Sequence, residues 1–255
     1  RDYFSNASIS DGMTDEIRLE YQKLSGALDS EKAVAVRSSA TVEDLPDLSF
    51  AGLQDTYLNV IGVDNLLKAV VDCWSSLWTA RAIGYRIRND VPHQDSSLAV
   101  VVQEMVASQA SGVLFTANPL SGLRSEIVID ATLGLGEALV AGQVEPDHYV
   151  VSSKERRIIS KTIGEKALSI HGKKDGGTQV IHQNANSIQA LPDEQILTLA
   201  RLCEQIADYY GLPQDIEWAW TKNSLYILQA RPITSLFPIP EGLSSGSLKV
   251  FVSFG

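Results

Sequence analysis

Residues 215–234, DIEWAWTKNSLYILQARPIT, constrain the fold more than any other stretch of the chain, because they contain two runs in which apolar and polar residues alternate. Alternation at a period of two predicts two paired strands, each with one buried face. The buried face of this hairpin is expected to consist of Trp218 and Trp220 on the first strand, with Tyr226, Leu228 and Ala230 on the second.

The opposite face of the hairpin carries charged and amide side chains. If the strands are joined by an odd-numbered loop of about three residues around 222–224, Glu217 falls opposite Gln229. The same register places Asp215 opposite Arg231, whereas a two-residue turn would break both pairings. A carboxylate beside an amide oxygen suits Mg²⁺, and an adjacent arginine suits phosphate. The pattern predicts a site for a metal-bound polyphosphate; the alternative is an amphipathic edge hairpin with solvated polar residues.

Composition excludes several classes of function. The chain has 255 residues, 44% of them hydrophobic, which is enough for one large α/β domain or two lobes of about 100 to 150 residues each. A formal charge of −10 argues against a nucleic-acid-binding surface, and no apolar run approaches the roughly 20 residues of a membrane span. Two isolated cysteines and the lack of a signal-peptide pattern favour a cytoplasmic protein.

Hydrophobic periodicity predicts strands and helices in alternation. Helices are expected over residues 14–28, 64–88 and 193–210, the second capped by Asp64 and the third by Asp193. Strands are expected over residues 33–36, 98–106, 112–116, 126–131, 147–152 and 157–163. Residues 166–186 are expected to be irregular, and the glycine-rich stretch 134–142 fails the dinucleotide-binding fingerprint.

Three further positions are candidates for nucleotide contacts. Arg37 follows the first buried strand and is succeeded by hydroxyl side chains, a combination that suits phosphate unless Arg37 pairs with Glu43 or Asp44. The loop 41–56 contains Gly52, whose missing side chain would let backbone amides approach an anion, although an ordinary surface loop would also contain such a glycine. Gln103 ends an apolar strand, where it is placed to meet a base or ribose.

Several long motifs occur in one order between residues 32 and 234: VAVRSSATVEDLPDLSFAGLQDTYLNV, VVVQEMV, SGVLFTANP, ATLGLGEALVAG, VEPDHYVV and LQARPIT. Together they resemble the N-terminal nucleotide-binding region of the phosphoenolpyruvate synthase and pyruvate phosphate dikinase family. The resemblance implies an α/β (α+β) fold of the ATP-grasp type, with mixed sheets, flanking helices and the N-terminal portion missing. It divides the chain into a partial ATP-binding domain, 1–235, and a linker with the first strand of an acceptor-binding domain, 236–255.

Within this resemblance, the cofactors are ATP and Mg²⁺. Arg37 and Arg231 would act on the phosphates as catalytic residues, Gly52 and Thr56 would lie in a flap over the nucleotide, and Gln103 would sit at the adenine side. Glu217 and Gln229 would hold Mg²⁺. In this family ATP is cleaved to AMP and phosphate, and a phosphoryl group passes through a histidine on a separate swivelling domain to a small-molecule acceptor.

The tail, LFPIPEGL followed by LKVFVSFG, resembles the stretch after the ATP domain in rifampin phosphotransferases, an antibiotic-inactivating branch of the family. A rifamycin is therefore the expected acceptor, pyruvate is the alternative, and a non-catalytic nucleotide-binding module is a third possibility. The family's glycine-rich GGKGxxL segment does not precede Arg37. None of His93, His148, His171 and His182 resembles the phosphate-carrying histidine, so we expect the chain alone to be inactive.

Overall fold

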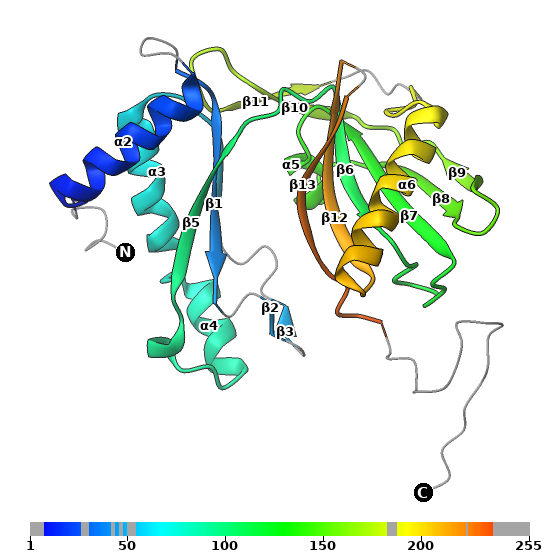
Figure 1. The fold of residues 1–255 in the computed structure, drawn as a ribbon, viewed down its shortest axis with the longest axis horizontal. Coiled ribbons are helices and arrows are strands. Elements are labelled where there is room, and N and C mark those ends of the chain that lie inside the picture. Colours follow the sequence, from blue (N-terminus) through cyan, green and yellow to red (C-terminus); the bar gives the residue numbers. More distant parts are fainter. Residues whose placement is uncertain are drawn as a thin grey trace, which may run out of the picture.

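Antiparallel strand pairing builds the protein into two lobes, each organised around one main sheet (Figure 1). The computed structural model describes residues 8–26, 31–41, 44–45, 48–49, 55–182, 188–222 and 224–236. Every strand ladder in the described part is antiparallel, and the one parallel contact is the isolated bridge between Gly134 and Ile170. The expectation of mixed sheets is therefore wrong, whereas the α/β class is confirmed.

The first lobe is a three-stranded sheet, ordered β4-β1-β5, with helices packed on its outer face (Figure 1). Its elements are α2 (Asp11–Ser25), β1 (Val34–Ala40), β4 (Thr56–Val60), α3 (Val63–Ser76), α4 (Ala80–Arg88), a 3₁₀ turn (His93–Asp95) and β5 (Leu98–Glu104), with the short pair β2 (Asp44–Leu45) and β3 (Leu48–Ser49) beside them. Val34 and Val36 of β1 are fully buried against Leu66 and Cys73 of α3. This packing fixes β1 as the central strand beneath the helices.

The second lobe is a six-stranded sheet, ordered β13-β12-β6-β7-β8-β9, with one long helix across one face (Figure 1). Its elements are β6 (Ala110–Phe115), β7 (Glu126–Leu133), α5 (Glu137–Val140), β8 (Asp147–Ser152), β9 (Arg157–Thr162), α6 (Asp193–Tyr210), β12 (Gln214–Thr221) and β13 (Ser224–Pro232). Ile196, Leu199 and Cys203 of α6 are fully buried in one core with Ile129 and Trp218 of the sheet. Because α6 covers that face, the polar residues of β12 are left to the other side.

A hairpin formed by β10 (Leu168–Gly172) and β11 (Thr178–His182) joins the two lobes at one end (Figure 1). On the second lobe, the amide of Leu135 donates to the carbonyl of Ile170 at 2.8 Å. On the first lobe, the side-chain amide of Asn59 donates to the carbonyls of Lys173 and Gly177 at 2.8 and 2.7 Å. The expectation of irregular structure over 166–186 is thus wrong for 168–172 and 178–182, where two positive-φ glycines allow a tight turn between short strands, while 183–186 lie outside the described residues.

Two other predicted boundaries differ from the structure. Strand β1 continues through Arg37 as far as Ala40, because residues 34–40 all pair with β5, so Arg37 lies within the sheet and not after it. The helix predicted over 64–88 is two helices. Thr79 caps the second of them, its hydroxyl accepting from the amide of Ala82 at 3.1 Å, and this capping interrupts the helical run.

Both cysteines are free and buried. Burial raises the pKa of Cys73 to about 12, with smaller contributions from the Asp55 and Asp72 carboxylates, and burial raises that of Cys203 to about 12. Both thiols are therefore almost wholly protonated at pH 8, and only the thiolate reacts. We expect native protein to resist a thiol reagent such as dithionitrobenzoate, and unfolded protein to titrate both groups at once. Rapid labelling of the folded protein would contradict this burial.

None of the helices in the described residues combines the length and apolar character required to cross a membrane.

Candidate functional site

The β12–β13 hairpin has the predicted residue pairing but a different connection between its strands. Thr221 pairs with Ser224, so two residues connect the strands, not three. A β-bulge between Glu217 and Trp218 then shifts the ladder by one residue. Beyond it, Glu217 lies opposite Gln229 and Asp215 opposite Arg231. The pairing is confirmed, while the expected loop length is wrong, because an extra residue in one strand compensates for the even-numbered connection.

The same bulge changes which side chains face the core. Trp218 is fully buried and Trp220 packs against the same core, as predicted. On β13, however, Leu225, Ile227 and Ala230 contact this core, whereas Tyr226 is 43% exposed and Leu228 lines the opposite face. The prediction was wrong for Tyr226 and Leu228 because an inserted residue reverses the inward and outward alternation along a strand.

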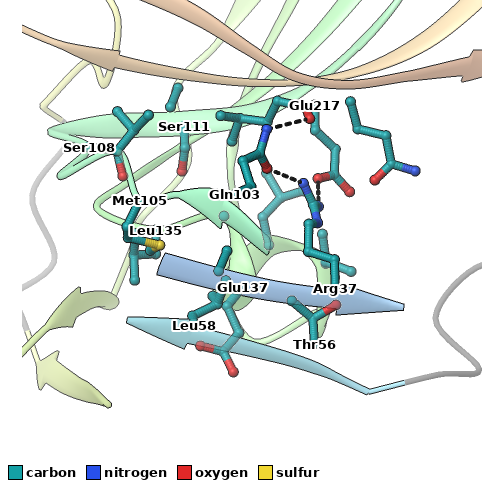
Figure 2. Close-up of a pocket in the computed structure, with 18 of the residues that line it drawn as sticks. Arg37, Thr56, Leu58, Gln103, Met105, Ser108, Ser111, Leu135, Glu137 and Glu217 are labelled. Atoms are coloured by element: carbon teal, nitrogen blue, oxygen red, sulfur yellow. Dashed lines mark hydrogen bonds and ion pairs between the residues drawn. The ribbon is translucent and has the colours of Figure 1, made fainter. Parts of the chain in front are cut away.

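A cavity of about 710 Å³ lies between the lobes and is lined by residues from both. Its two ends differ in character (Figure 2). Charged and amide side chains line one end: Arg37, Gln103, Glu217, Gln229 and Arg231. Apolar side chains predominate at the other end, namely Leu58, Met105, Leu135, Leu139 and Val140, and Ser108, Ser111 and Glu137 also lie there (Figure 2). One polar and one apolar end suit a ligand that has an anionic part and a flat apolar part.

At the polar end, Arg37 of β1 reaches across from the first lobe to Glu217 of β12 (Figure 2). One terminal nitrogen of the guanidinium forms an ion pair with Glu217, and the other donates to the Gln103 side-chain oxygen at 3.3 Å. The Arg37 and Glu217 side chains are 20% and 30% exposed. This partial burial makes the pair stronger than one on the open surface. Residues 180 positions apart in the chain therefore meet at one point of the cavity.

Arg231 occupies a different position at the same end. Its Nε and Nη2 atoms donate to Asp215 at 2.8 and 2.7 Å, on the strand directly opposite. Burial raises the pKa of Asp215, whereas the Arg231 charge and hydrogen bond lower it and Glu217 raises it further. A bound carboxylate of this kind holds the guanidinium in a fixed orientation at the edge of the cavity.

The apolar end contains residues that sequence reasoning missed. Leu58, Met105 and Leu135 come from three separate segments and belong to one apolar cluster (Figure 2). Glu137, the first residue of α5, lines the same cavity. The sequence offers two hints of these positions: Met105 directly follows the apolar strand, and Glu137 lies in the glycine-rich GLGE stretch. Neither hint is specific, because apolar side chains after a strand are ordinary core residues in most proteins and a glutamate at the start of a helix is common.

The remaining predicted positions divide into two groups. Thr56, the first residue of β4, lines the cavity, whereas Gly52 lies outside the described residues. In the described part of the chain, no group of three or more His, Cys, Asp or Glu side chains could hold a metal ion. No histidine is among the described residues that line the cavity.

Comparison with known proteins identifies the family. A family profile described as "Pyruvate phosphate dikinase, AMP/ATP-binding domain" matches residues 1–239. The chain belongs to this family. It is 52% identical over 227 residues to a protein named rifampicin phosphotransferase from Bacillus cereus, and likewise to one from Bacillus subtilis. It is 47% identical over 235 residues to the phosphoenolpyruvate synthase of Pyrococcus furiosus. These alignments cover 88% of this chain in each case.

The relatives are much longer than the chain. The aligned part makes up 26% of each Bacillus protein and 29% of the Pyrococcus protein. The chain is therefore similar to one AMP/ATP-binding domain of these dikinase phosphotransferases, and it spans between a quarter and a third of their length.

Proposed function

We propose that the cavity binds ATP with its triphosphate at the polar end and its adenine at the apolar end, within a fold of the ATP-grasp type. The observation that carries this proposal is the convergence of Arg37, Glu217, Gln229 and Arg231 on one cavity whose far end is apolar. Two arginines offer bidentate donors to phosphate oxygens, and Leu58 and Met105 offer apolar surface to a base. Thr56 and the loop containing Gly52 are proposed to cover the phosphates.

The donor set at the polar end fits Mg²⁺. Glu217 supplies a carboxylate and Gln229 an amide oxygen from directly opposite positions, and Mg²⁺ prefers a small number of protein oxygens with phosphate and water as further ligands. A bound Mg²⁺ would neutralise phosphate charge as the phosphoryl group transfers. Arg37 already pairs with the Glu217 carboxylate, so on binding Arg37 would exchange Glu217 for phosphate and Glu217 would exchange Arg37 for the metal, and each would keep an oppositely charged partner.

We further propose that the complete protein is a dikinase-type phosphotransferase that cleaves ATP to AMP and phosphate. A phosphoryl group would pass to a histidine on another, swivelling domain and then to a small-molecule acceptor. Transfer of this kind needs positioning and charge neutralisation, which Arg37 and Arg231 are placed to provide. Residues 1–235 would form the ATP-binding domain, and 236–255 would lead into the acceptor-binding domain.

A rifamycin is the proposed acceptor, because the relatives at 52% identity are named rifampicin phosphotransferases. Pyruvate is the second candidate, favoured by the phosphoenolpyruvate synthase at 47% identity. A non-catalytic nucleotide-binding module is a weaker candidate, since it would have no physical reason to keep converging charges that are costly to desolvate.

Two assays on the complete polypeptide separate these candidates. We expect it to exchange isotopic label between AMP and ATP, and to protect growing cells against rifampicin. Exchange without protection, accompanied by pyruvate-dependent AMP formation, would assign the acceptor to pyruvate. Absence of exchange, with ATP still bound, would support the non-catalytic module and contradict the proposed reaction.

A further inference from the structure

Gln103 of β5 contacts Arg37 within its own lobe and the backbone of the second lobe across the cavity (Figure 2). Its side-chain oxygen accepts from Arg37 Nη1 at 3.3 Å, and its side-chain nitrogen donates to the backbone carbonyl of Leu228 at 3.2 Å. Arg37 in turn contacts Glu217. Four strands therefore contribute to one chain of contacts, with Gln103 between the guanidinium of the first lobe and the backbone of the second.

The β-bulge explains why this carbonyl is available. Leu228 is the extra residue of the bulge and has no partner in the ladder with β12. A bulged residue leaves its backbone groups outside the regular pairing. A carbonyl without a partner is costly away from water, and the Gln103 amide satisfies it. The bulge that aligns Glu217 with Gln229 thus also provides the anchor for Gln103.

Anchoring Gln103 has a consequence for Arg37. An arginine side chain has many rotamers, and a single ion pair leaves its planar guanidinium free to turn about that contact. With one terminal nitrogen on Glu217 and the other on Gln103, both ends of the Arg37 fork have a fixed partner. The orientation of the fork matters because phosphate recognition by arginine is bidentate.

We propose that Gln103 is a positioning residue for Arg37 and does not read the nucleotide base. This role rests on the proposed binding of ATP in the same cavity. Both amide groups of Gln103 already have protein partners at the polar end, whereas a base reader would present at least one of them to the adenine. We therefore assign recognition of the base to the apolar end of the cavity.

The two roles predict different responses to Gln103→Met, which keeps the side-chain length and removes both hydrogen bonds. If Gln103 positions Arg37, we expect kcat/KM for ATP in the complete enzyme to fall roughly 10- to 100-fold, the range for a hydrogen bond to a charged group. The inhibition constant of magnesium tripolyphosphate, which has no base, should rise with it. That of adenosine, which has no phosphate, should stay unchanged. Gln103→Glu keeps the acceptor for Arg37 and should recover part of the loss.

A matched control is Gln205→Ala, on the exposed side of α6 and outside the cavity lining. It should leave all three constants unchanged. A rise in the adenosine constant of Gln103→Met, in proportion to the loss for ATP, would overturn the proposal in favour of base reading. An unchanged kcat/KM for Gln103→Met would overturn it as well.

A double-mutant cycle separates this role from the proposed function. If Gln103 acts through Arg37, Gln103→Met should have almost no further effect in an Arg37→Ala background. Additive losses would show that Gln103 acts independently, and would overturn its positioning role while leaving the nucleotide site intact. If Arg37→Ala alone leaves ATP kinetics unchanged, it is the proposed phosphate site that fails.

Discussion

Replacing Glu217 by alanine is expected to lower the turnover of the complete enzyme at least about 10²-fold, by analogy with the removal of single electrostatic groups from other active sites. The variant removes the carboxylate proposed to hold Mg²⁺ and leaves Arg37 without its partner across the cavity. Arg37→Ala is expected to cost a similar factor, because it removes the guanidinium proposed to bind the phosphates. Steady-state kcat and KM for ATP, measured over a range of Mg²⁺ concentrations, test both variants.

Glu155 and Arg157 provide matched controls, because they form an exposed carboxylate–guanidinium pair near the turn between β8 and β9, outside the cavity lining. Alanine at either position should leave ATP kinetics unchanged. The Glu217→Ala variant should also need more Mg²⁺ for half-maximal rate. Kinetics close to those of the parent enzyme in either cavity variant would refute the assignment of that residue.

Asp147→Ala is expected to destabilise the fold by about 3 to 5 kcal/mol, the cost of breaking a buried ion pair. Asp147 and Lys166 are both fully buried and paired with each other. The Asp147 carboxylate also accepts from the amides of Gly164 and Ala190 at 3.0 and 2.7 Å, and from the Tyr149 hydroxyl at 2.9 Å. Removing it leaves a buried ammonium and three donors without this acceptor. Equilibrium urea unfolding of the chain, followed by tryptophan fluorescence, measures the loss.

A surface pair gives the comparison for this variant. Glu20 and Lys23 form an ion pair at 2.6 Å on α2, with both side chains more than half exposed. Glu20→Ala should change the free energy of unfolding by less than about 1 kcal/mol, because water screens exposed pairs. Similar unfolding midpoints for Asp147→Ala and Glu20→Ala would show that the buried network contributes little beyond a surface contact.

Hydrophobic periodicity was sufficient to predict the helices and strands that bury one face over many residues. The predicted bounds of α6 match the structure, since its apolar positions repeat at helical spacing and Gly211 ends it in a left-handed conformation, although its N-cap is Pro192 and not the predicted Asp193. The same reasoning failed for 64–88, where a single capping hydroxyl at Thr79 ends one helical run and begins another. It failed again for β10 and β11, which are short, largely polar strands whose pairing depends on contacts with both lobes.

The sequence by itself determined the chemistry of the candidate site: Arg37 on one strand, and a carboxylate, an amide and a second arginine on alternating positions of one hairpin, within motifs that place the chain in its family. Alternation is a local property, so it assigned Glu217, Gln229 and Arg231 to one face. Only the tertiary structure decided that a bulge at Leu228 restores their register and that Arg37 approaches from the other lobe. The physical reason is that the bulge depends on how β12 and β13 pair, and the contact across 180 residues on how two sheets meet, and no local pattern records either.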